Sequence, residues 1–286
     1  MAIITRLKCS STAKRKREDP SSTPAVTAAA DLHLVSLNYI RQGLKMSKDE
    51  IAKQRSMELY NLLGKKKLFL ILDLDHTLLH TVSKKRLTPT EQFAFMNTKE
   101  DYANGVLFRS EKRITKLRPF VRTFLEEASK LFQLCVYTMG DPSYAQKMVS
   151  FLDPENKYFG ARVISCNDNT RKDKKGLDVV LAPESAVLIV DDTESVWDKH
   201  AANLILIEKY NYFAAASSKG SASRTNAPSY SESFQDESET DGELALILSI
   251  LTRAHQMFFD DHTMGRDVRN VLKSIWEHVD DPMDCN

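Results

Sequence analysis

Two aspartates at the end of an apolar run are the residues best suited to chemistry in this sequence. Residues 68–72 are Leu, Phe, Leu, Ile and Leu, and Asp73 and Asp75 come next with one residue between them. Such a run is typical of a buried strand in a parallel sheet, which carries both carboxylates to its C-terminal end. There one carboxylate can attack phosphorus while the other transfers a proton. Because short polar residues also end many ordinary strands, the prediction of phosphoryl transfer depends on further residues downstream.

A second strand-like run ends in a hydroxyl side chain. Residues 132–137 precede Thr138 and, two residues later, Gly140. A hydroxyl can bind a phosphate oxygen, and a glycine lets the backbone approach it closely. Taken alone, Thr138 is equally an ordinary β-branched strand residue before a turn.

A third apolar run, residues 186–190, is closed by the carboxylates of Asp191 and Asp192. Parallel strands bring their C-terminal ends to one edge of the sheet, so these carboxylates should lie near Asp73. Hard oxygen ligands of this kind are what Mg²⁺ requires. Asp191 and Asp192 are therefore the metal candidates.

The segment between the second and third runs is strongly basic, with four cationic residues in five positions from Arg171 to Lys175. Phosphoryl transfer needs a fixed positive charge, which screens the attacking carboxylate and stabilises the charge on the phosphate oxygens. One of these lysines can supply it, and the rest of the run is typical of a solvated loop.

The order of these features resembles the signature of the haloacid dehalogenase superfamily. The string LDLDHTLLHT over residues 72–81 is similar to that of the FCP-type phosphatases, which act on the C-terminal domain of RNA polymerase II. The resemblance covers roughly residues 64–213, includes the strings at 116–120 and 190–197, and is greatest to the plant members. Those generally continue into a BRCT domain, whereas this sequence ends at Asn286 without one. We therefore expect catalysis to be kept and recruitment to differ.

The resemblance implies a role for each candidate. Asp73 becomes the nucleophile and Asp75 the general acid and base. Thr138 and Lys175 become the phosphate ligands, with Lys174 as the second candidate for the lysine.

The resemblance also implies a metal site. Mg²⁺ would bind Asp73, the backbone carbonyl of Asp75 and Asp192, with Asp191 close by. Arg118 recurs in the family pattern, but its position before Pro119 is equally that of a residue leading into a helix, so we give it no role in the site.

The elements that must position these residues alternate between strand and helix. Further strand-like runs at 162–166 and 203–207 complete a pattern that predicts an α/β fold with a doubly wound parallel sheet. The resemblance implies that this sheet is of the HAD-like Rossmannoid type. Residues 80–117 predict a small β insertion after the first strand, with a role in substrate selection. Helical spacing begins at Pro119 and again at Asp141, and these apolar stripes belong to the core.

The chain divides into five parts by composition and periodicity. They are a disordered basic tail (1–30), a helical lead-in (31–63) with a capping pattern at Ser47, a central domain (64–213) that the resemblance identifies as the FCP-type phosphatase domain, a Ser-rich acidic linker or insert (214–242), and C-terminal helices (243–281).

Composition excludes several classes of protein. The 286 residues carry 40 basic and 39 acidic side chains, so no global field favours nucleic acid or a membrane surface. No apolar stretch approaches the ~20 residues that span a bilayer, and the first residues lack a signal-peptide core. Residues 14–17, Lys-Arg-Lys-Arg, resemble a nuclear import signal, and the acidic Glu18 and Asp19 disfavour the competing mitochondrial transit peptide. We expect a nuclear protein.

The four cysteines, Cys9, Cys135, Cys166 and Cys285, show no zinc or redox spacing, which fits a reducing compartment. A thiol phosphatase is excluded because only four residues separate Cys166 from Arg171 and none is Gly.

Three functions stay open, in order of preference. The first is a Mg²⁺-dependent phosphatase acting on phosphoserines of the polymerase heptad repeats. The second is a relative acting on small phosphorylated metabolites, and the third is a non-catalytic binding protein of the same fold. The complete set of candidate side chains favours the first.

Overall fold

The computed structural model describes residues 34–97, 103–214, 231, 235–260 and 265–279, which belong to one compact unit. The predicted N-terminal tail and most of the acidic segment lie outside the described residues. No helix in the described part of the chain is long and apolar enough to cross a membrane.

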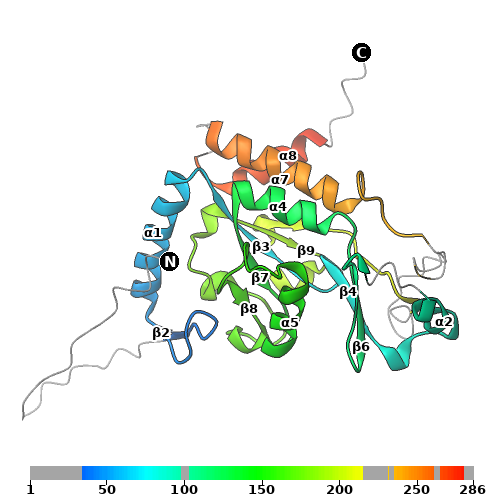
Figure 1. Cartoon of the computed structure of the whole chain (residues 1–286). Coiled ribbons are helices and arrows are strands. Elements are labelled where there is room, and N and C mark those ends of the chain that lie inside the picture. The colour runs from blue at the N-terminus through cyan, green and yellow to red at the C-terminus, as the bar shows by residue number, and fades with distance from the viewer. Residues whose placement is uncertain (1–33, 98–102, 215–230, 232–234, 261–264, 280–286) are drawn as a thin grey trace, which may run out of the picture. The chain divides into compact units, whose positions relative to one another are not determined.

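A five-stranded parallel sheet forms the centre of this unit (Figure 1), which confirms the predicted α/β fold. Its order is β10-β9-β3-β7-β8, with β3 in the middle. The strands are β3 (Leu68–Leu72), β7 (Phe132–Tyr137), β8 (Val163–Ile164), β9 (Val187–Asp191) and β10 (Leu204–Leu206). Every residue of β3 and β9 is buried because both faces of the sheet are covered, which explains why these runs are apolar throughout.

Helices cover one face of the sheet, where α4 (Val121–Leu131), α5 (Pro142–Leu152), α7 (Glu243–Asp260) and α8 (Val268–Val279) share one apolar core with alternate residues of the strands. Figure 1 shows α7 lying along α4 with α8 beyond it. The other face packs on α1 (Lys48–Gly64) and on short 3₁₀ turns around Trp197. The C-terminal helices thus extend the core of the phosphatase fold.

Local sequence signals set the helix starts. Ser47 caps α1 in a reciprocal capping box with Glu50, as its pattern predicted. Asp141 caps α5, and Pro142 occupies its first turn. The helix expected from Pro119 begins two residues later, because Phe120 adopts a left-handed conformation with φ of 65°.

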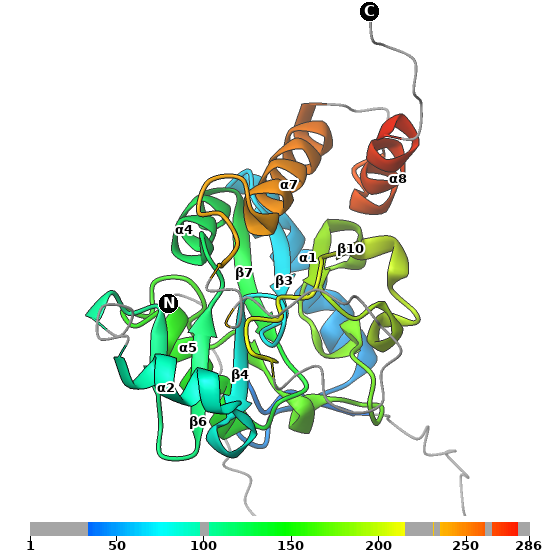
Figure 2. The ribbon, with the colours of Figure 1, turned by 90° about the vertical axis from the view of Figure 1, so that its right-hand side faces the viewer.

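The predicted insertion after β3 is a three-stranded antiparallel sheet that stands beside the parallel sheet (Figure 2). Its strands are β4 (Leu79–Ser83), β5 (Leu107–Arg109) and β6 (Arg113–Leu117), in the order β4-β6-β5. Between β4 and β5 the chain forms the 3₁₀ turn η2 (Lys84–Arg86) and α2 (Pro89–Asn97). One face of this sheet contacts α5, and the other covers a small cluster around Phe95 and Phe213.

Two features were not anticipated. The lead-in contains a two-stranded hairpin of β1 (Val35–Ser36) and β2 (Lys45–Met46), whose strands are too short to show periodicity. The described end of the acidic segment, residues 235–242, is also no free linker, because Asp236 and Glu237 form ion pairs with Lys116 and Arg118.

Candidate active site

The candidate residues meet because β3 lies between β7 and β9. Leu72 at the end of β3 is in register with Val136 of β7 and Val190 of β9. The residues just beyond these positions therefore arrive at the same edge of the sheet, and they include Asp73, Thr138 and Asp191. This is the edge where open α/β sheets bind ligands.

A tight loop turns the chain after Asp73. The amides of Leu78 and Leu79 both donate to the carbonyl of Leu74, and His76 adopts a φ of 66°. The amide of Asp73 donates to the carbonyl of Val190, which anchors the start of this loop to β9. The loop thus presents the carboxylates of Asp73 and Asp75 from one compact turn.

Lys175 is the cation of the site. Its side chain is buried, and its Nζ lies 2.5 Å from Asp73 Oδ1 and 2.5 Å from Asp191 Oδ2. The Lys175 amide donates to the carbonyl of Val196. Burial opposes the charge of Lys175, but the two carboxylates outweigh it and raise its pKa, so the ammonium is kept. Lys174, the second candidate, instead donates to the carbonyl of Ser195 and lies outside the cluster.

Two aromatic rings complete the surroundings of Lys175. Its Nζ lies 5.7 Å from the ring centre of Trp197 and 5.8 Å from that of Tyr137. Both rings are buried, and these distances are within the range of cation–π attraction. Lys175 is therefore held in one position by both charge and packing.

Asp73, Asp191 and Asp192 form the one group in the described part of the chain that offers clustered metal ligands. One carboxylate oxygen of each lies within 4.8 Å of the others, and all three residues are buried. Buried carboxylates so close together repel one another unless cations compensate them, and Lys175 and Lys209 together supply two charges for three carboxylates. The donor set is that of a hard divalent cation.

The two neighbouring aspartates differ in how freely they can bind a metal. Asp191 accepts from the Trp197 indole at 2.9 Å and from the Thr193 amide at 2.8 Å, in addition to Lys175. Asp192 instead pairs with Lys209, whose Nζ lies 2.6 Å from its Oδ2 and whose side chain is half exposed. Asp191 is thus fixed by protein groups, whereas Lys209 can leave Asp192 for solvent.

Asp75 lies outside the metal cluster. Its Oδ1 accepts a hydrogen bond of 2.5 Å from the hydroxyl of Tyr144, on α5. Burial raises the pKa of Asp75, and the bond from Tyr144 opposes that shift. A carboxyl group whose pKa is raised can be protonated when substrate arrives, which suits a general acid. The predicted metal contact of Asp75, through its backbone carbonyl, stays a prediction.

Thr138 lies where the strand pattern placed it, at the end of β7. Its side chain is buried, and its Oγ1 accepts from the Gly140 amide at 3.0 Å. A Cβ added at Gly140 would clash with the ring of Tyr144. The glycine therefore keeps the turn after β7 close to the residue that contacts Asp75.

The structure brings the charged candidates together as the sequence predicted. Lys175 and the three clustered aspartates share one buried site, Asp75 follows on the same turn as Asp73, and Thr138 ends the neighbouring strand.

Sequence reasoning missed Tyr144, Lys209 and the anchoring role of Trp197. Trp197 lies within a string that carried the family resemblance, which was the one available signal. Tyr144 and Lys209 carried none, because their contacts join positions 69 and 17 residues apart.

Arg118 also has a role that its position before Pro119 did not reveal. Its guanidinium is buried and donates to the carbonyl of Thr77 at 3.1 Å, in the loop that holds Asp75. Glu237 pairs with the same guanidinium through both of its oxygens, each at 2.7 Å. Arg118 therefore stabilises the loop that carries the two carboxylates.

The fold places carboxylates at the end of a central parallel strand, and the family model that matches the chain is one of phosphatases. Residues 68–221, more than half of the chain, match the model of the NLI interacting factor-like phosphatase family. The chain belongs to this family.

Curated relatives carry related names. The chain is 44% identical over 255 residues to RNA polymerase II C-terminal domain phosphatase-like 4 of Arabidopsis thaliana, covering 86% of this chain and 57% of the relative. It is 36% identical over 236 residues to RNA polymerase II C-terminal domain phosphatase-like 3 of the same plant, covering 77% of this chain and 19% of that protein. The chain thus spans from about a fifth to just over half of the length of these relatives.

Solved structures show the same fold. The structure of Fcp1, described as an essential RNA polymerase II CTD phosphatase, superposes with a TM-score of 0.61 over 77% of this chain and 73% of that one, at 23% identity. A variant of fission yeast Fcp1 bound to beryllium fluoride superposes with a TM-score of 0.59 over 77% of this chain and 74% of that one, at 22% identity. At this identity the likeness concerns the fold.

Proposed function

We propose that the chain is a protein serine phosphatase that hydrolyses phosphoserines in the C-terminal heptad repeats of RNA polymerase II, through an aspartyl-phosphate on Asp73. The observation that carries this proposal is the pairing of Asp73 with Lys175, beside a second carboxylate, Asp75, that is held by Tyr144. Family membership and the names of the relatives support the reaction and its substrate.

The first step is attack by Asp73 on phosphorus. A bond forms between a carboxylate oxygen of Asp73 and phosphorus, and the bond from phosphorus to the seryl oxygen breaks. Protonated Asp75 gives its proton to that leaving oxygen. Lys175 and the hydroxyl of Thr138 bind the phosphate oxygens, whose negative charge would otherwise repel the attacking carboxylate.

The second step hydrolyses the aspartyl-phosphate. Asp75, now ionised, takes a proton from water, and the water oxygen bonds to phosphorus as the bond to Asp73 breaks. Inorganic phosphate leaves, and Asp75 is again protonated for the next substrate. Tyr144 keeps Asp75 in one orientation during both transfers.

The carboxylates of Asp73 and Asp192 and the backbone carbonyl of Asp75 would hold Mg²⁺, with Asp191 alongside. Bound there, Mg²⁺ neutralises charge on the phosphate oxygens. Lys209 contacts only Oδ2 of Asp192, and its half-exposed side chain can turn to solvent if that oxygen becomes the ligand. A substrate on RNA polymerase II also implies a nuclear location.

Asp73→Asn tests the nucleophile. The amide keeps the shape of the side chain but cannot form the phosphate ester, so turnover of heptad phosphopeptides should fall below detection while the melting temperature stays near that of the wild type. Assays with Mg²⁺ should compare peptides phosphorylated at single serines with p-nitrophenyl phosphate and small phosphorylated metabolites.

Turnover by Asp73→Asn at the wild-type rate would contradict the covalent step. Equal kcat/KM values for the metabolites and the heptad peptides would contradict the substrate and favour a metabolite phosphatase. The exposed substitution Lys53→Ala, on α1, serves as the matched control.

A further inference from the structure

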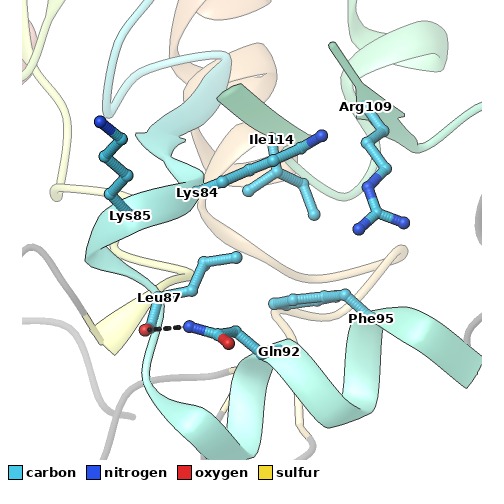
Figure 3. A pocket seen from close by; sticks show the side chains of 7 residues that line it. All are labelled: Lys84, Lys85, Leu87, Gln92, Phe95, Arg109 and Ile114. Atoms are coloured by element: carbon cyan, nitrogen blue, oxygen red, sulfur yellow. Dashed lines mark hydrogen bonds between the residues drawn. The ribbon is translucent and has the colours of Figure 1, made fainter. Parts of the chain in front are cut away.

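A cavity lies on the insertion, away from the carboxylates. Its volume is about 240 Å³, and its lining consists of Lys84, Lys85, Leu87, Gln92, Phe95, Arg109 and Ile114. Figure 3 shows Lys84 and Arg109 both reaching into the space above Phe95 and Gln92. We name it the insertion pocket.

The charged side chains that line the insertion pocket are all positive, and within the described residues no carboxylate pairs with them. Lys84, Lys85 and Arg109 form no ion pair with any acidic residue of the described chain. Arg86 and Lys112 add two more cations, since Arg86 ends η2 and the carbonyl of Lys112 accepts from the Lys84 amide. These cations repel one another. An anion bound between them is attracted by each cation and offsets their repulsion.

The pocket has a buried apolar base. Ile114 of β6 is in register with Val82 of β4 and with Arg109 of β5, so these side chains share one face of the insertion sheet. Phe95 from α2 packs onto that face and is 4% exposed. The cations therefore project from a fixed surface, which lowers the entropy cost of ordering them around a ligand.

The insertion sheet connects this pocket to the catalytic loop. β4 starts four residues after Asp75 and runs for five residues, which is roughly 16 Å of strand, before it reaches Lys84. Arg113 lies next to Ile114, but it faces the other way, with its guanidinium 5.0 Å from the ring centre of Tyr144. The insertion pocket thus opens on the face of the sheet opposite to Tyr144.

We infer that the insertion pocket binds a second phosphoserine of the same substrate chain, outside the residue being hydrolysed. This inference rests on the proposed function. A phosphate carries close to two negative charges and three acceptor oxygens, which suit the Lys84 ammonium and the Arg109 guanidinium. The apolar base accepts the side chain next to it. A compact cavity suits one such group better than the continuous groove that tracks a nucleic-acid backbone.

The path between the two sites sets a minimum spacing. A peptide must follow about 16 Å of strand and then pass to the opposite face of the sheet, and the strand alone takes at least about five extended residues. Phosphoserines in neighbouring or more distant heptads meet this requirement. Two phosphoserines three residues apart do not.

The test compares KM values for three peptides of equal length. One carries a single phosphoserine, the second carries two that are 14 residues apart, and the third carries two that are three residues apart. For the wild type, the second peptide should have a KM roughly tenfold below that of the first, which corresponds to one charge-assisted contact, and the third should match the first. The double variant Lys84→Ala/Arg109→Ala should lose this advantage and keep its kcat.

Several controls separate the possible results. Lys53→Ala/Arg253→Ala removes the same two charges from exposed positions of α1 and α7 and should keep the advantage. Turnover of p-nitrophenyl phosphate reports the catalytic site alone and should be unchanged in both double variants. If Lys84→Ala/Arg109→Ala unfolds, Lys84→Gln/Arg109→Gln replaces it.

The inference is overturned if the wild type shows equal KM values for the first two peptides, or if the double variant loses affinity for all three equally. Competition by single-stranded RNA that depends on Lys84 and Arg109, with no effect of the second phosphate, would assign the pocket to nucleic acid instead. If no peptide is hydrolysed, the proposed function fails. Binding of the same three peptides, measured by fluorescence anisotropy, then tests the pocket separately.

Discussion

At the scale of single residues, two carboxylates on one turn differ because their neighbours differ. Asp73 contacts the ammonium of Lys175, whereas Asp75 accepts from a neutral hydroxyl, that of Tyr144. Burial raises the pKa of both, but the Lys175 ammonium opposes that rise at Asp73 most directly. The pKa of Asp73 stays well above its usual range although Lys175 opposes the effect of burial, so further positive charge at the carboxylate cluster is needed to keep Asp73 ionised for attack. Asp75, whose hydrogen-bond partner is a hydroxyl, can hold the proton that the leaving oxygen takes up in the proposed reaction.

Tyr144→Phe should lower kcat by about 10- to 100-fold. The substitution removes a hydrogen bond to a group that is charged in half of the cycle, worth about 1.5–3 kcal/mol, and leaves Asp75 free to rotate. KM for p-nitrophenyl phosphate should change little, because Tyr144 positions Asp75 and need not touch the phosphate. Tyr60→Phe, at a position 81% exposed, is the control. An unaltered kcat would show that Asp75 needs no such support.

At the scale of elements, the insertion sheet begins where the catalytic loop ends, so its packing bears on the site. His80 of β4 is buried, its ring centre lies 4.5 Å from that of His76, and its Nδ1 accepts from the Phe213 amide at 3.2 Å. Burial, aided by the nearby His76, lowers the pKa of His80 to about 3. The folded protein therefore keeps this imidazole neutral.

Stability should fall as pH falls below about 6.5. In the unfolded chain, His80 binds a proton near its ordinary pKa of about 6.5. In the folded chain, His80 stays unprotonated until the pH approaches 3. The free energy of unfolding should thus lose up to about 1.4 kcal/mol per pH unit in this window because of this one group. Urea unfolding at pH 7.5, 6.0 and 5.0 measures it.

His80→Gln should remove the contribution of one proton from that slope, which is up to about 1.4 kcal/mol per pH unit, since the amide does not titrate. A slope that is the same in the wild type and His80→Gln would mean that the imidazole is protonated in the folded state.

At the scale of the whole molecule, the acidic segment ties the C-terminal part of the chain back to the catalytic loop. Asp236 pairs with Lys116 at 2.8 Å, Glu237 pairs with Arg118, and Glu239 accepts from the amide of Phe120 at the start of α4. The last two contacts each join positions 119 residues apart. Glu237 and Glu239 come just before α7 in the chain, and α7 packs on α4. The segment therefore holds the insertion, the loop and α4 in one arrangement.

Glu237→Gln should destabilise the protein by about 3–5 kcal/mol. The Arg118 side chain is fully buried and that of Glu237 only 11% exposed, so the substitution leaves a buried guanidinium without its counter-charge. Thermal or urea unfolding measures the loss. Glu127→Gln, which breaks the exposed pair with Lys130, should cause no measurable change. Equal stability of Glu237→Gln and the wild type would show that solvent reaches Arg118 in solution.

The sequence by itself determined the central strands, the edge to which they carry Asp73, Thr138 and Asp191, and the insertion after the first strand. These follow from local patterns, because apolar runs define buried strands and a parallel sheet aligns their ends. The catalytic role of each residue rests on resemblance, and the structure supplies the geometry with which that role is tested.

Only the tertiary structure decided which side chains meet across the fold. It placed Lys175 rather than Lys174 among the carboxylates, brought Tyr144 to Asp75, and joined Glu237 to Arg118. These contacts depend on how separate elements pack, so no local periodicity encodes them. The positive insertion pocket arises in the same way, from an η2 turn, a strand and a helix that are brought together by the small apolar cluster beneath them.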